Sequence, residues 1–374
     1  MIHCRCAASF PSNEDRMEAT TIDIEQFRNI EQASLHFESG MNILCGANAQ
    51  GKTNALEALY LFANGKSFRT AFDKDLVAFG KECSRLSLSY HDGRRDNVLS
   101  LRLFAGRGRE HRKNDVHIPS AAEFMGSFRA VLFSPEHIGV VKGGPGERRL
   151  FADAAICQLK PLFLLSLQKY NNILKQRNSL LKSAENGRSP SFDTTLAIWS
   201  AQLAREAAYI AQEREHFTEA ISQKVAGFFR HLSGGEECVS MRYDKRLSEE
   251  EYLRKLSENT EREIAAGATL YGIHRDDIII ELNGRDSRLF ASQGQQRSIA
   301  FALKIGEGML SEEISGTSPV YLFDDVLSEL DARRRARVLE AMDGRQTVVT
   351  TCMESDFDGI AAKKIRVENG AFFE

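Results

Sequence analysis

The sequence lacks the features that mark exported and membrane proteins. Its seven cysteines are scattered, without a C-x-x-C pair or a nearby histidine cluster, which disfavours a zinc site and a disulfide framework. No apolar run approaches the roughly 18 residues that a membrane helix needs, and residues 1–16 lack the continuous apolar core of a signal peptide. We therefore expect a cytoplasmic protein without a membrane partner.

A general excess of positive charge is also missing. The chain has 49 lysines and arginines against 52 aspartates and glutamates, a net charge of −3. Any DNA binding must therefore come from a local basic patch. We expect it in the glycine-containing segment 102–113, at Arg107, Arg109, Arg112 and Lys113. The alternative to DNA binding is that these side chains face solvent and pair with nearby acidic residues. This alternative is favoured for a second basic group, Arg333, Arg334, Arg335 and Arg337.

A complete phosphate-binding loop, G-x-x-x-x-G-K-[ST], occupies residues 46–53. A short apolar strand precedes it and a strong helix former follows it, which is the context that such a loop requires. Its backbone N–H groups and the helix N-terminus can bind phosphates. Lys52 would reach the outer phosphates, and Thr53 would hold Mg²⁺ through its hydroxyl. The nucleotide-binding residues expected in this region are Gly46, Ala47, Asn48, Ala49, Gln50, Gly51, Lys52, Thr53 and Asn54.

A second part of the site is expected where the apolar strand 319–323 ends in Asp324 and Asp325. Loops converge at the carboxyl edge of a parallel sheet, so acidic residues there suit a metal-dependent phosphate site. Asp324 would bind Mg²⁺, directly or through water, and Asp325 would orient and deprotonate the attacking water. An apolar run that ends in two aspartates is common by itself, and the P-loop upstream gives it this meaning.

An ATP-binding cassette head also needs a serine-glycine loop at a helix N-terminus, which contacts the γ-phosphate bound to a partner subunit. Residues 232–237 look like such a signature, but the alternating segment after them predicts a strand. Residues 292–297 lead directly into the helix 298–305 at a spacing before Asp324 that allows one helix, one loop and one strand. We therefore interpret the first loop as a structural turn and expect the catalytic and nucleotide contacts from Ser292, with Gly294 and Gln295 beside it.

A change in the spacing of apolar residues along the sequence indicates how the chain is organised. Apolar residues recur at helical spacing from residue 163 to 181 and, after the turn 185–190, from 196 to 228, which predicts two antiparallel helices. We expect an α/β fold, an ABC-type P-loop ATPase head with an inserted, mainly helical second lobe. The expected divisions are 1–18, disordered or a mis-assigned start; 19–155, the first half of the head; 156–265, the helical arm; and 266–374, the second half of the head.

Several motifs resemble those of the RecF family of bacterial DNA replication and repair ATPases. They lie at residues 27–29, 51–54, 65–70, 133–136, 175–178, 272–277, 292–297 and 323–331. The resemblance implies an SMC-like head that binds ATP and Mg²⁺, forms an ATP-dependent head-to-tail homodimer, and binds double-stranded DNA with slow, DNA-stimulated ATP hydrolysis. It also implies action with RecR and RecO at single-strand gaps in DNA, to help load RecA.

The chain departs from related ATPases at three places. Residues 134–137 lack the glutamine that many cassette ATPases carry in this loop, the strand 346–351 ends in threonines where transporters have a switch histidine, and Asp325 replaces the usual glutamate. The shorter base fits slow hydrolysis.

Two other functions remain open. A transport ATPase subunit is disfavoured by the helical arm and the missing switch histidine. A structural SMC-type tether would need far longer coiled coils than residues 160–265 allow.

Overall fold

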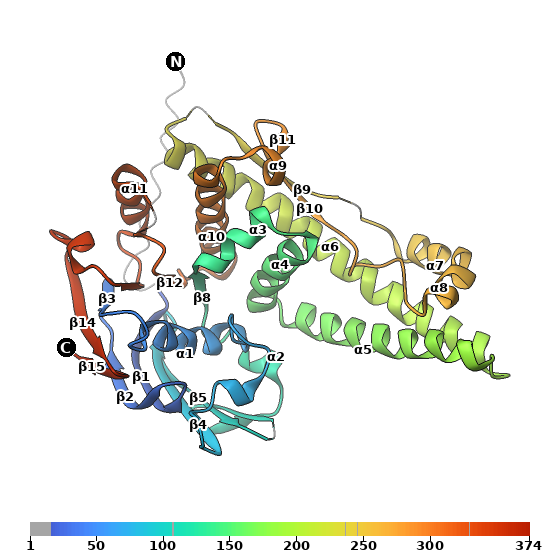
Figure 1. Ribbon diagram of the computed structural model, residues 1–374, viewed down its shortest axis with the longest axis horizontal. Helices are drawn as coiled ribbons and strands as arrows, with labels where there is room; N and C mark the ends of the chain where they lie inside the picture. Colours follow the sequence, from blue (N-terminus) through green and yellow to red (C-terminus); the bar gives the residue numbers. More distant parts are fainter. Residues whose placement is uncertain (1–15, 107, 236, 245, 329) are drawn as a thin grey trace. The chain divides into compact units, whose positions relative to one another are not determined.

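The computed structural model (Figure 1) describes residues 16–374 except Arg107, Glu236, Lys245 and Glu329. The chain divides into two compact units: the first runs up to Pro135 and resumes over Glu307–Glu374, and the second is Glu136–Gly306. These limits differ from the divisions expected after residues 155 and 265, because α4 (Pro145–Leu159) and β9 (Val239–Tyr243) pack with the arm helices, and β10 (Ile278–Leu282) pairs with β9. The division into functional lobes therefore stays a prediction.

The first unit contains an antiparallel sheet, in which buried residues alternate with more exposed ones along β4 and β5. Its order is β2-β1-β4-β5-β6-β7. The strands are β1 (Glu18–Phe27), β2 (Ile30–His36), β4 (Cys83–His91), β5 (Asp96–Phe104), β6 (Arg109–Lys113) and β7 (Val116–Ile118). Met17 is buried and its N–H donates to the carbonyl of Ser318 at 3.1 Å. Residues 16–18 are thus ordered, which excludes disorder for them, whereas the expected mis-assigned start stays a prediction; residues 1–15 lie outside the described residues.

A second, mostly parallel sheet carries the functional edge of this unit. Its order is β15-β14-β3-β13-β12-β8, and only the β14–β15 pair is antiparallel. The strands are β3 (Met41–Cys45), β8 (Ala130–Phe133), β12 (Val320–Asp324), β13 (Thr347–Thr351), β14 (Ala362–Glu368) and β15 (Ala371–Phe373). In register, Thr350 lies opposite both Leu44 and Asp324. The P-loop and the two aspartates thus start from the same edge of the sheet.

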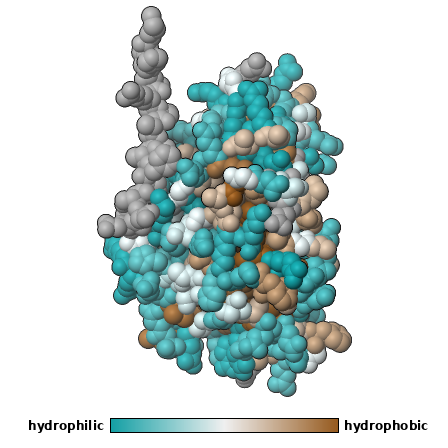
Figure 2. All heavy atoms as spheres, turned by 90° about the vertical axis from the view of Figure 1, so that its left-hand side faces the viewer, coloured by the Kyte–Doolittle hydropathy of each residue, from teal (hydrophilic) through white to brown (hydrophobic). Residues whose placement is uncertain are grey.

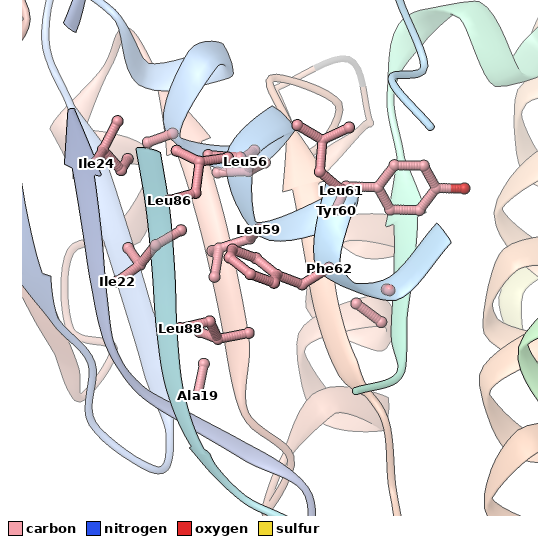
Figure 3. Close-up of a cluster of buried hydrophobic side chains, with 14 of the residues drawn as sticks. Ala19, Ile22, Ile24, Leu56, Leu59, Tyr60, Leu61, Phe62, Leu86 and Leu88 are labelled. Carbon is pink, nitrogen blue, oxygen red and sulfur yellow. The ribbon is translucent and has the colours of Figure 1, made fainter. Parts of the chain in front are cut away.

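Helix α1 (Lys52–Asn64) lies between the two sheets and is apolar almost all round. Leu56, Leu59 and Phe62 pack with Ile22 and Leu88 of the antiparallel sheet (Figure 3), in a core that also includes Leu322 and Val348 of the parallel sheet. A helix buried on every side cannot shift without disrupting both sheets. The core therefore fixes the N-terminus of α1, which is where phosphates would bind.

The second unit is built on two long helices, α5 (Pro161–Ser183) and α6 (Phe192–Ser233). Lys160 pairs with Glu213 and Arg177 bonds to Ser200, so the helices are antiparallel as predicted. The small sheet β11-β10-β9, with β11 (Arg285–Asp286), completes the unit. Its other helices are α3 (Gly139–Lys142), α7 (Glu249–Glu258), α8 (Thr260–Ala266) and α9 (Ser287–Phe290). Helix α10 (Gln293–Ser315) begins here and ends in the first unit, which also holds α2 (Ala121–Phe124) and α11 (Ala332–Met342).

The loop 272–277 ties the helices of the second unit together. The His274 ring bonds to the Tyr170 hydroxyl at 2.7 Å, and Asp276 accepts bonds from Tyr243 at 2.5 Å and Tyr252 at 3.2 Å. Asp277 receives a bidentate contact from Arg148 of α4 at 2.7 and 2.8 Å. Burial raises the pKa of Asp276 and lowers the pKa of His274. This loop, one of the RecF-like motifs, therefore has a structural role.

Hydrophilic side chains cover most of the face shown in Figure 2, and the apolar ones lie in small groups among them. Over the part of the chain that the structure describes, no helix is both long enough and apolar enough to cross a membrane.

Candidate nucleotide site

The P-loop follows β3 and turns at two glycines with positive φ. At Gly46, with φ 159°, a Cβ atom would lie 2.3 Å from the carbonyl oxygen of Val367 on β14. At Gly51, with φ 116°, it would lie 3.2 Å from the Asn29 amide oxygen. Only glycine permits both the backbone angle at Gly51 and the close approach at Gly46. The loop can therefore turn its N–H groups inward.

The Lys52 side chain lies inside the loop and is 6% exposed. Its ammonium donates to the carbonyls of Gly46 at 2.7 Å and Ala47 at 2.8 Å, and lies 3.5 Å from the Cys352 sulfur at the end of β13. These neutral acceptors hold the cation in the loop without cancelling its charge. Phosphate oxygens would replace them with stronger, charge-assisted bonds.

The first turn of α1 meets the end of β12 directly. The Thr53 hydroxyl donates to Asp324 Oδ1 at 2.8 Å, and the Thr350 hydroxyl on the intervening strand β13 donates to the same oxygen at 2.7 Å. Asp324 is 6% exposed. A hydroxyl and a carboxylate are oxygen ligands of the kind that Mg²⁺ takes, with phosphates and water supplying the rest. The two predicted metal ligands thus fit Mg²⁺, and Thr350 orients one of them.

Asp325 has a left-handed backbone, with φ 53°. This conformation is unfavourable for a residue with a side chain, and neighbouring bonds must hold it. The Asp325 N–H donates to the Thr350 hydroxyl oxygen at 3.0 Å, and the Ser328 hydroxyl donates to the Asp325 carbonyl at 2.9 Å. The chain therefore turns sharply between the candidate metal ligand and the candidate base, and the turn sets the direction of the second carboxylate.

The loop is also held from outside. Gln50 accepts bonds from the N–H groups of Asn369 at 2.5 Å and Gly370 at 2.8 Å in the β14–β15 turn. Asn54, the last residue expected at the nucleotide, donates at 2.7 Å to Asn29 in the β1–β2 turn, and Asn29 donates to the Ala49 carbonyl at 3.4 Å. Asn48 contacts the Cys352 thiol at 2.8 Å. Turns from both sheets thus fix the loop.

The two serine loops differ in the end of the helix at which they lie. The Ser292 hydroxyl accepts from the Gln295 N–H at 3.3 Å, and the Gln295 side chain accepts from the Ser292 N–H at 2.7 Å, which is a capping box at the N-terminus of α10. Ser233 is the last residue of α6, and Gly234 caps that helix with φ 91°. A helix C-terminus repels anions, whereas an N-terminus attracts them. The predicted strand after Ser233 is present as β9.

The comparisons with known proteins agree with this geometry. The sequence matches the model of the RecF/RecN/SMC N-terminal domain family over residues 19–369. The DNA replication and repair protein RecF of Lachnoclostridium phytofermentans is 37% identical over 334 residues, which cover 89% of this chain and 92% of that protein. RecF of Bacillus subtilis is 35% identical over 376 residues, which cover 95% and 99%. The chain belongs to the RecF family.

Solved structures confirm the predicted RecF-type fold. The recombination mediator protein RecF-ATP of the RecFOR pathway has a TM-score of 0.89 and 31% identity, covering 96% of this chain and 97% of that chain. The Smc head domain of Pyrococcus furiosus with an extended coiled coil is 16% identical, with a TM-score of 0.55 and 95% of both chains covered, and shares the fold. The predicted ABC-type ATPase head with an inserted helical lobe is therefore confirmed.

Two of the RecF-like motifs, 27–29 and 65–70, contact the buried Glu57 of α1, a residue to which the sequence analysis gave no role. Glu57 of α1 is fully buried and accepts two bonds from Arg28 at 2.9 and 2.8 Å and one from the Ser67 hydroxyl at 2.5 Å. Arg69 bonds to Asn54 at 2.7 Å. Because a buried carboxylate needs a partner, the glutamate in an otherwise apolar helix was the signal that could have revealed the pair.

The basic segment assigned to DNA, residues 102–113, contains the end of β5 and all of β6, the strand next to the edge strand β7. Arg109 is paired with Asp73 and also donates to the Gly65 carbonyl. Lys113 contacts the Ser127 hydroxyl at 3.3 Å, and burial lowers the pKa of Lys113. Arg112 is exposed, and Arg107 lies outside the described residues. The structure therefore gives Arg109 an internal partner, and a role in DNA binding for this segment stays a prediction.

Proposed function

We propose that this RecF-family chain is an ATP-dependent DNA-binding protein of bacterial DNA replication and repair, with slow ATP hydrolysis that DNA stimulates. The bond between Thr53 and Asp324 carries the proposal, because it joins the P-loop to the acidic strand end in a head of the RecF fold. Both parts are needed for hydrolysis, and each would mean little alone.

The residues divide the chemistry between them. The backbone N–H groups of the P-loop and Lys52 bind the phosphates. Thr53 and Asp324 would hold Mg²⁺, which supplies charge neutralisation on the phosphate oxygens when bound. Asp325 orients the attacking water and accepts its proton. An aspartate reaches less far than a glutamate, which supports slow turnover.

We propose that ATP joins two copies head to tail. Ser292 at the N-terminus of α10 then meets the γ-phosphate held by the partner copy, where N–H groups and the helix dipole favour negative charge. Gly294 would allow close approach, and Gln295 would hold the serine through its capping bond. In this state the dimer binds double-stranded DNA beside single-strand gaps in the cytoplasm and, with RecR and RecO, helps to load RecA.

The test is ATP turnover by the full chain alone, with intact duplex, with gapped duplex, and with lipid vesicles. Stimulation by DNA and an ATP-dependent increase in hydrodynamic size support the proposal. Turnover that responds to vesicles and not to DNA would favour a transport ATPase instead.

A further inference from the structure

Helix α5 contains no acidic residue. Its 23 residues include Lys169, Lys175, Arg177 and Lys182. With 52 acidic residues among 374, about three would be expected in a helix of this length. Most exposed helices alternate the signs of their charges, because pairs four residues apart stabilise the helix. The absence of acids therefore leaves the exposed lysines of α5 uncompensated along their own helix.

One face of α5 presents only hydrogen-bond donors and cations to solvent at successive turns. Asn171, Lys175, Ser179 and Lys182 are exposed, and we call them the α5 polar face. They border a hollow of about 470 Å³ that is also lined by Leu174 and Asn178. At about 1.5 Å per residue, the four side chains span about 16 Å along the helix. The face is thus a straight row of donors.

Other residues of α5 are held by internal hydrogen bonds. Arg177 is fully buried and bonds to Ser200 at 3.1 Å, to Thr269 at 2.7 Å and to Glu263 at 2.5 Å. The Asn178 side chain accepts the Thr269 N–H at 2.8 Å. Nearby acids are already used, because Glu263 pairs with Arg177 and Glu261 pairs with Arg188. No ion pair to Lys175 or Lys182 is present within the described ranges.

We propose that the α5 polar face binds the phosphate backbone of duplex DNA. The inference rests on the proposed function and names a surface for it. Amides, hydroxyls and ammonium groups are the donors that contact phosphates without reading sequence. A protein partner is less suited, because the buried centre of a protein interface is rich in aromatic and apolar side chains, whereas the hollow beside the α5 polar face is lined by a single apolar residue, Leu174.

The experiment is a salt titration of the affinity of the full chain, with a non-hydrolysable ATP analogue and Mg²⁺, for a fluorescent blunt duplex. The test variant is Lys175→Ala with Lys182→Ala. The control is Lys169→Ala with Arg205→Ala, which removes the same charge. Lys169 lies six residues from Lys175, which places it about 120° around the helix, and Arg205 is exposed on α6.

The expected result is about a tenfold weaker affinity at moderate salt, and a slope of log affinity against log salt that falls by about two for each copy contacting the duplex. The control should keep the wild-type slope. Lys175→Arg with Lys182→Arg should restore binding, because the charges return. ATP binding and DNA-free turnover should not change in any variant, which shows that the proteins are folded.

The outcomes separate the two proposals. If the wild-type chain fails to bind duplex under any condition, the proposed function fails. If the wild type binds and the Lys175 and Lys182 variant binds with the same affinity and slope, only the assignment of the α5 polar face is overturned. Normal DNA binding by that variant with lost association with RecR would assign the face to a protein and would also overturn the inference.

Discussion

The hydroxyl of Thr53 donates a hydrogen bond of 2.8 Å to Asp324, which lies 271 positions later in the chain. Strands β3, β13 and β12 are neighbours in the parallel sheet, and all three end at the same edge. The segments that follow β3 and end β12 therefore lie close together. Thr350 on β13 donates to the same carboxylate oxygen at 2.7 Å. Both metal-ligand candidates are therefore in place before a nucleotide arrives, and little reorganisation is needed on binding.

Replacing Lys52 should remove most of the ATP affinity. The ammonium would exchange two backbone carbonyls for charged phosphate oxygens, and a bond to a charged group is worth about 1.5–3 kcal/mol. We expect Lys52→Ala to weaken ATP binding by at least roughly tenfold in equilibrium titration. Lys66→Ala, which removes an exposed lysine beyond the end of α1, is the control. Wild-type affinity in Lys52→Ala would contradict the assignment of the whole site.

Asp325→Asn should retain ATP and trap the dimer. The change removes the base and leaves Asp324, so hydrolysis should fall by about 10²–10⁴-fold while nucleotide binding persists. Size measurements with ATP should show a long-lived dimer. Asp324→Asn should behave differently, with weaker Mg²⁺-dependent binding. Turnover at the wild-type rate in Asp325→Asn would assign the base to another group.

Local patterns in the sequence predicted the parts of the site that depend on neighbouring residues. The spacing of Gly46, Gly51 and Lys52 defines the P-loop, and the apolar run before Asp324 defines its strand. Helical periodicity predicted α5 and α6, and the residues after Ser292 predicted the start of α10. Each of these depends on backbone conformation and on a burial pattern within about 20 residues.

Pairings between distant segments could not be predicted in this way. Nothing near Thr350 indicates that it would bond to Asp324, and nothing near Arg109 indicates that Asp73 would neutralise it. The Arg28–Glu57 pair and the use of loop 272–277 as a structural tie have the same origin. Partner choice depends on which strands become neighbours, and a single sequence does not record it directly. For this reason the sequence did not indicate that Arg109, which was assigned to DNA, pairs with Asp73 inside the protein.

The partly buried His274 should make the second unit sensitive to acid. Burial lowers the pKa of His274 below its ordinary value of 6.5. The unfolded chain then binds the proton more readily than the fold, so this contribution to stability is present above pH 6.5 and is lost as the pH falls through the folded pKa.

Thermal melts between pH 8 and pH 5, a range set about the ordinary histidine pKa, should show a steeper loss of Tm in the wild type than in His274→Gln. The glutamine variant keeps a polar side chain for Tyr170 but cannot take up the proton. His36→Gln, which changes an exposed histidine of β2, is the control and should follow the wild type. Parallel pH profiles for the wild type and His274→Gln would remove His274 as the acid-sensitive group.

The two serine loops give the sharpest test. Ser292→Arg should leave ATP binding by the monomer nearly intact, because the P-loop lies in the other unit of the chain. Dimerisation and hydrolysis should both collapse, since the arginine fills the space that the phosphate must enter and removes the hydroxyl donor. Ser233→Arg, at the C-terminus of α6, should cost at most some stability. Loss of dimerisation in Ser233→Arg, with normal dimers in Ser292→Arg, would reverse the assignment of the two loops.

Mixing variants tests the head-to-tail arrangement itself. Each composite site takes its P-loop from one copy and its signature serine from the other. A dimer of Ser292→Arg with Lys52→Ala therefore has one site with both defects and one site with neither. Neither protein alone should hydrolyse ATP. Each mixed dimer has one intact site of two, and a statistical mixture contains about half mixed dimers, so the mixture should recover about a quarter of the wild-type activity. Complete absence of recovery, with mixed dimers detected by size or crosslinking, would show that each site is built within a single copy.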